Sequence, residues 1–96
     1  MKVREFELKG RKYLGCEGEI SSGSNLVFIK GSNGFIMCSY LNLETAEKMN
    51  NIAAIVTGVK TIDDMLKKDI SNATTNAKQI GIVPGISVLE ALDKLS

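Results

Sequence analysis

Apolar and polar residues alternate along the start of the chain, in residues 2–8 and again in residues 12–20. A period of two is typical of a strand that buries one face. In the second segment Ile20 falls in the apolar phase, whereas Tyr13 falls with the glutamates. We therefore expect two half-buried strands that turn at Gly10, with Ile20 in the apolar phase of the second.

The next two apolar segments, residues 26–29 and 35–38, do not alternate. Strands of this kind are buried on both faces, by helices, by another sheet or by another subunit. Asn33 and Gly34 lie between them, and this pair suits a turn with positive φ. The pattern predicts an antiparallel hairpin at the centre of a sheet.

The hydrophobic period changes from two to 3.6 near residue 42. Asn42 is a suitable N-cap for a helix over residues 43–50. The run 52–56 is short, apolar and partly β-branched, which favours a buried strand.

Three short helices are expected after this strand, each preceded by a capping residue. Thr61 caps the first and Ser71 the second, which Gly81 ends in the left-handed conformation. Ser87 and Glu90 have the spacing of a capping box and begin the last helix.

The order of elements predicts an α+β fold, with an N-terminal antiparallel β region, a helix, a buried strand and three short C-terminal helices. The 96 residues suit one domain, residues 1–96, in which 1–41 is mainly β and 42–96 mainly helical. The later helices are expected to cover only one side of the sheet. Residues 1–41 are therefore predicted to self-associate, at least as a dimer, to bury the other side.

Composition argues against several classes of function. The net charge is +1 with both signs interleaved, so no basic surface for nucleic acid is expected. No apolar run approaches the ~20 residues of a membrane span, and no export signal is visible. We therefore expect a cytoplasmic protein in which Cys16 and Cys38 are free thiols. Without histidine, no metal site or cofactor is expected.

Cys38 is the candidate nucleophile, because it ends an apolar strand where the chain turns polar. A cation or a helix N-terminus would have to lower the pKa of its thiol. The alternative is a small core residue, since free cysteine is among the most buried residue types.

The segment Gly58, Val59, Lys60 and Thr61 is the candidate site for a small anion. It joins a buried strand to a helix start, where free backbone N–H groups and Lys60 could hold a phosphate or carboxylate. It lacks the spacing of a P-loop. The alternative is a turn in which Gly58 bends the chain, Thr61 caps the helix and Lys60 is solvated.

Three stretches of the second part, residues 34–41, 53–61 and 81–92, carry a resemblance to a known family. They include Ala-Ala-Ile-Val-Thr-Gly-Val-Lys-Thr and the later Glu-Ala-Leu. The chain resembles the YunC-like family of bacterial and archaeal proteins. The resemblance implies tetramerisation through an N-terminal β region and no assigned activity. Three classes of function stay open: an oligomeric binding or structural module, a small-anion-binding protein, and a thiol-dependent enzyme.

Overall fold

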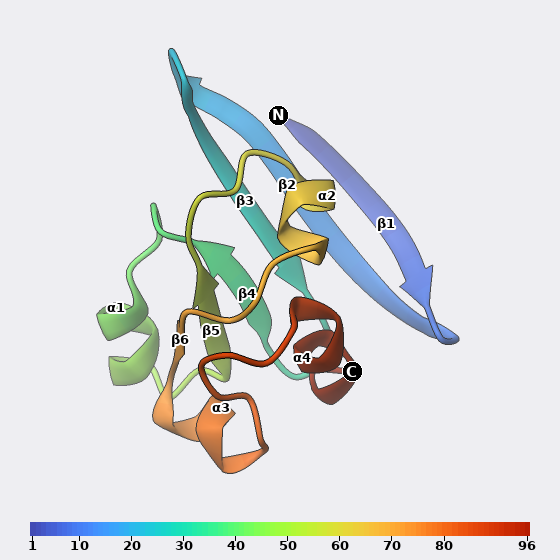
Figure 1. The fold of residues 1–96 in the computed structure, drawn as a ribbon, viewed down its shortest axis with the longest axis vertical. Helices are drawn as coiled ribbons and strands as arrows, with labels where there is room; N and C mark the ends of the chain where they lie inside the picture. The colour runs from blue at the N-terminus through green and yellow to red at the C-terminus, as the bar shows by residue number, and fades with distance from the viewer.

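Six strands form one mixed sheet in the computed structural model, which describes residues 1–96, in the order β1-β2-β3-β4-β5-β6 (Figure 1). The strands are β1 (Lys2–Leu8), β2 (Arg11–Ser21), β3 (Ser24–Lys30), β4 (Phe35–Cys38), β5 (Ala53–Val56) and β6 (Asn72–Ala73). The helices are α1 (Leu43–Lys48), α2 (Ile62–Leu66), α3 (Thr75–Gln79) and α4 (Val88–Lys94). Neighbouring strands are antiparallel except β4 and β5, which are parallel and joined through α1. The α+β class is confirmed.

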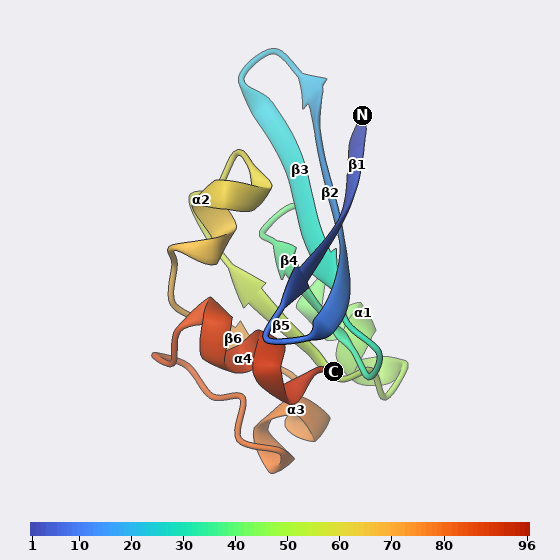
Figure 2. The same ribbon diagram turned by 90° about the vertical axis from the view of Figure 1, so that its right-hand side faces the viewer.

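The two faces of the sheet are covered by different helices. We call the face under α2 and α4 the inner face, and the opposite one the outer face (Figure 2). The larger apolar cluster lies on the inner face, and a smaller cluster of Met37, Ala46 and Ala53 lies on the outer face. Ala46 belongs to α1, so α1 covers the outer face of β4 and β5. The expectation that the helices cover only one side of the sheet is therefore wrong.

Burial differs between the two strands that were expected to be apolar on both faces. The last three residues of β4 are buried, as predicted, because helices lie on both of its sides. In β3 the buried residues are Val27 and Ile29, whereas Phe28 between them is only half-buried. No helix covers the outer face of β3 within the chain, so burial of that face by another sheet or another subunit stays a prediction.

The inner core receives α4 in the predicted orientation, with Val88, Ala91, Leu92 and Leu95 fully buried. Tyr13 also faces this core and is 3% exposed, although it shares the phase of the glutamates in β2. Its hydroxyl donates a hydrogen bond of 2.7 Å to the carbonyl of Leu92, so the buried ring keeps a polar partner. Ile20 is in the apolar phase but is 51% exposed, because β2 extends beyond the helices at that end.

The connection between β3 and β4 contains Gly34 for a reason other than the predicted one. Neither Asn33 nor Gly34 has a positive φ. A Cβ atom at Gly34 would collide with the carbonyl oxygen of Ile52. The close approach of the segment before β5 therefore excludes a side chain there.

Most predicted helix starts are confirmed. The confirmed caps accept backbone hydrogen bonds in the first turn: Asn42 from Glu44 at 2.8 Å, Thr61 from Asp64 at 3.0 Å, and Ser87 from Glu90 at 3.1 Å. Gly81 has the expected positive φ of 93°. The expectation for Ser71 is wrong, because Thr74 caps α3 and residues 72–73 form β6.

Candidate functional site

Cys38 lies at the end of β4 and is 2% exposed. Its side chain belongs to the inner apolar cluster, and its sulfur accepts a hydrogen bond of 3.4 Å from the backbone N–H of Val27. This environment is that of a core residue, the alternative given above. No substrate can reach the thiol without local opening of the sheet, and its role as a nucleophile stays a prediction.

The segment 58–61 follows β5, whose end lies beside that of β4 because Cys38 is in register with Val56. Gly58 has a φ of +74°, as a turn requires. Thr61 caps α2, and the Lys60 N–H donates to the Asp64 carboxylate at 3.3 Å. A carboxylate of the chain itself thus occupies part of the proposed anion site. The Lys60 side chain is exposed, and anion binding here stays a prediction.

The outer face of β1, β2 and β3 is the largest part of the sheet that no helix covers (Figures 1 and 2). Apolar side chains lie on it: Leu14 and Phe28 are half-buried, and Val3 is 64% exposed. Cys16 lies between Val3 and Phe28 in the strand register and is 6% exposed. This apolar surface continues toward the smaller cluster beneath α1, which Phe28 also contacts.

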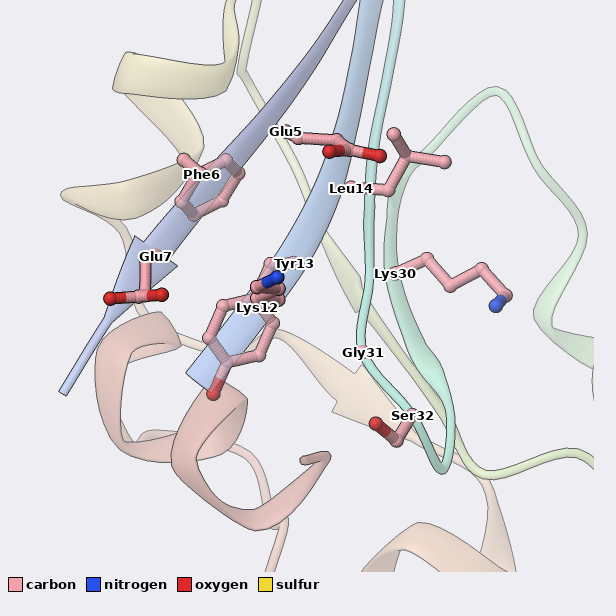
Figure 3. Close-up of a pocket in the computed structure, with 9 residues that line it drawn as sticks. All are labelled: Glu5, Phe6, Glu7, Lys12, Tyr13, Leu14, Lys30, Gly31 and Ser32. Carbon is pink, nitrogen blue, oxygen red and sulfur yellow. The ribbon is translucent and has the colours of Figure 1, made fainter. Parts of the chain in front are cut away.

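A hollow of about 590 Å³ lies at the end of the sheet nearest the β1–β2 turn, and residues of both faces line it. It is lined by Glu5, Phe6, Glu7, Lys12, Tyr13, Leu14, Lys30, Gly31 and Ser32 (Figure 3). Glu5, Leu14 and Lys30 come from three adjacent strands and are in register with one another. The hollow therefore has a carboxylate on one side of an apolar residue and an ammonium group on the other.

The sequence alone indicated some of these residues, but not their grouping. The alternation in residues 2–8 implies that Val3 and Glu5, two residues apart, share one side of a strand, as they do in β1. Lys30 could be placed beside them only after the register of β2 with β3 was known.

The structure was searched for clusters of metal-ligating side chains and for membrane-spanning helices. No three His, Cys, Asp or Glu side chains lie close enough together to bind one metal ion. None of the helices is both long and apolar enough to cross a bilayer.

Comparison with known proteins identifies the family. The model of a family described as "Domain of unknown function (DUF1805)" matches residues 37–95. The chain belongs to the DUF1805 family. It is similar to the uncharacterized protein YunC of Bacillus subtilis (strain 168). The two sequences are 32% identical over 76 residues, and the match covers 75% of each chain. The predicted resemblance to the YunC-like family is thus confirmed.

A solved structure extends the likeness to the whole fold. A protein of unknown function from Thermoplasma acidophilum has 40% sequence identity and a TM-score of 0.94, over 99% of this chain and 92% of that one. The DUF1805 match begins within β4, so β1, β2 and β3 lie outside the matched residues. The Thermoplasma structure includes them, and its likeness shows that the long N-terminal strands are shared between the two proteins.

Proposed function

We propose that this member of the DUF1805 family is a homo-oligomeric binding or structural module, assembled through the outer face of β1, β2 and β3. The observation that supports it is the apolar surface beside α1, formed by the half-buried Leu14 and Phe28 and the exposed Val3. In a monomer these side chains would keep contact with water, and a second copy would remove that cost.

A dimer is the smallest assembly that this face supports, since an interface between identical faces closes on itself. The tetramer implied by the YunC-like resemblance needs a second interface elsewhere. The proposal places the protein in the cytoplasm, a compartment in which thiols such as Cys16 and Cys38 stay reduced.

Light scattering on the wild type and on Val3→Asp tests the proposal. Val3 is exposed in the monomer, so aspartate there should leave the fold intact and disfavour burial of the face. We expect a multiple of 10.4 kDa for the wild type at micromolar concentration, and a shift toward 10.4 kDa for the variant.

The matched control is Leu89→Asp, because Leu89 is 52% exposed but lies on α4, which packs on the inner face. This variant should keep the wild-type mass. A wild type of 10.4 kDa at every concentration would contradict the proposal, as would equal losses of mass in both variants.

A further inference from the structure

The hollow beside the β1–β2 turn forms where β3 leaves β2. The pairing of these two strands ends at Leu14 and Lys30, although β2 begins at Arg11. After Lys30 the chain turns away, and at Gly31 its backbone packs so closely on the carbonyl of Leu95 that a Cβ atom would collide with it. The first residues of β2 therefore pair with β1 only, and the hollow of about 590 Å³ lies on their other side.

The backbone of Lys12 is unpartnered on this open side. The turn between β1 and β2 consists of Lys9 and Gly10, both with positive φ. A two-residue turn of this kind is closed by a pair that exchanges backbone hydrogen bonds, here Leu8 and Arg11. Successive residues of a strand direct their backbone groups to opposite neighbours, so those of Lys12 point away from β1. No strand lies opposite them, and they make no turn or loop hydrogen bond. Lys12 thus offers a free N–H donor at the hollow.

Four exposed charged side chains line the hollow: Glu5, Glu7, Lys12 and Lys30. None of them takes part in the three ion pairs of the structure. Glu7 and Lys12 are in register with each other, so each charge has an opposite charge as its neighbour. Glu5 and Lys30 are both in register with Leu14 instead. The charges without an opposite neighbour are therefore one carboxylate and one ammonium group, separated by an apolar side chain.

The close-up in Figure 3 shows how these groups surround the hollow. Glu5 lies at one end, with its carboxylate beside Leu14, and Ser32 lies at the other end. Lys30 and Lys12 lie on opposite sides between them. The hollow is thus acidic at one end and has lysines, a hydroxyl group and a free backbone N–H toward the other.

We propose that this hollow binds a short peptide in its zwitterionic form. The free ammonium group of the peptide lies at Glu5, and its terminal carboxylate lies at Lys30. The N–H of Lys12 and the hydroxyl of Ser32 also donate to that carboxylate. Leu14, between the two charges, contacts an apolar side chain in the middle of the peptide. Every residue of this site belongs to one chain, so binding does not rest on the proposed assembly.

The spacing of the strands sets the length of the peptide. Neighbouring strands lie about 4.8 Å apart, so the backbones at Glu5 on β1 and Lys30 on β3 are about 10 Å apart, with β2 between them. An extended peptide rises about 3.3 Å per residue, so three residues span this distance. The ammonium and carboxylate groups of a single amino acid are bonded to one carbon atom and cannot reach both side chains.

A ligand with a single kind of charge fits the hollow less well. A phosphate attracted to Lys30 would also face the carboxylate of Glu5, and a diamine would place an ammonium group near Lys30. Like charges brought together reject the wrong ligand. The two charges therefore select a ligand that carries one of each.

The hollow is a neighbour of the apolar surface proposed for assembly. Leu14 belongs to both, whereas Val3 and Phe28 do not line the hollow. Val3→Asp therefore changes the apolar surface and leaves the lining of the hollow as it is, so that assembly and peptide binding can be measured separately.

Titration with alanyl-leucyl-alanine, followed by NMR at low ionic strength, tests the site. We expect the amide signals of Glu5, Leu14 and Lys30 to shift. Leucine alone, the N-acetylated tripeptide and the C-amidated tripeptide should each bind more weakly. The same titration of Val3→Asp should give the wild-type dissociation constant.

Two charge variants test the direction of the peptide. Glu5→Gln should raise the dissociation constant of the free tripeptide about two- to fivefold and leave that of the N-acetylated form unchanged. Lys30→Gln should have the same effect on the free tripeptide and none on the C-amidated form. The matched controls are Glu19→Gln and Lys67→Gln, two exposed positions outside the hollow, which should bind like the wild type.

The results distinguish this site from the proposed function. Equal affinities for the free and the blocked tripeptides would overturn the site, as would equal losses in the variants and their controls. If the wild type assembles but binds no tripeptide, the site is wrong and the proposed assembly stands. If it binds the tripeptide as a monomer, the site stands and the assembly is wrong.

Discussion

Cys16 and Cys38 lie on opposite faces of the sheet and therefore have different surroundings. Cys16 is in register with Phe28, and Phe28 with Met37, so Cys16 shares the outer face with Met37. Cys38 follows Met37 and points into the inner core, where its sulfur accepts the Val27 N–H. The sheet between the two thiols prevents a disulfide within one chain.

We predict that Cys38 reacts with a small alkylating reagent only as fast as the β3–β4 region opens. Burial within the inner apolar cluster removes the thiol from the reagent. Mass spectrometry of the Cys38 peptide after timed alkylation measures the rate, with urea-unfolded protein as the reference. Rapid native alkylation of Cys38 would contradict this prediction and favour the thiol-dependent enzyme.

At the scale of elements, α1 and α3 are joined by a carboxylate. Glu47 of α1 accepts hydrogen bonds from the backbone N–H of Thr75 at 2.8 Å and from its hydroxyl at 2.9 Å. Thr75 is the first residue of α3, so Glu47 supplies a cap from another helix. The backbone hydrogen bond, then the hydroxyl and the charge of Lys78, hold the pKa of Glu47 below its usual 4.5.

This contact predicts that the fold loses stability as the pH falls. A carboxylate with a lowered folded pKa stabilises the fold fully above its unfolded pKa, and the contribution is lost as pH falls through the folded value. We therefore expect Glu47→Gln to unfold in less urea than the wild type at neutral pH. The difference should shrink as the pH falls below about 4.5 and vanish once the pH lies below the lowered pKa of Glu47 in the folded state.

The control for this prediction is Glu19→Gln. The carboxylate of Glu19 makes no hydrogen bond or ion pair in the structure. The difference in urea stability between Glu19→Gln and the wild type should therefore not shrink as the pH falls. A gap between wild type and Glu47→Gln that persists in acid would show that the carboxylate charge is not what caps α3.

The elements that sequence could predict are those fixed by local chemistry. Asn42, Thr61 and Ser87 cap helices because each side chain bonds to a nearby backbone N–H. Ser71 has the same local chemistry, but its N–H donates to the carbonyl of Ile55, which draws the segment into the sheet. Pairing of this segment with β5 overrides the capping preference of Ser71. The two segments are far apart in the sequence, so no local pattern predicts the pairing.

In the candidate sites, too, some features follow from local sequence and others only from the three-dimensional structure. Thr61 and Gly58 have the turn chemistry expected from their sequence. The uncovered part of the outer face could be identified only from the three-dimensional structure, because α1 could have packed on either side of the sheet. Once α1 covers β4 and β5, the uncovered surface narrows to β1, β2 and β3. Self-association was predicted from the hydrophobicity of the strands. The face at which two copies would meet follows only from the position of α1.

At the scale of the whole molecule, the sheet is covered unequally. The inner face receives α2 and α4, and its core contains most of the buried apolar residues (Figure 2). The outer face receives only the six residues of α1. The long β1, β2 and β3 strands thus depend on one apolar layer in the monomer, and a partner sheet would supply the second.

This coverage predicts that stability depends on protein concentration. If burial of the outer face is coupled to folding, mass action makes the assembled state more stable as concentration rises. Above the dissociation constant, a tenfold increase should raise the midpoint of thermal unfolding by ~3–6 °C for a dimer of chains this size. Calorimetry over a range of concentrations measures the shift. Val3→Asp should remove the dependence and Leu89→Asp should keep it, because only Val3 lies on the outer face. A midpoint that does not move with wild-type concentration would mean that the N-terminal strands are stable with one face in water.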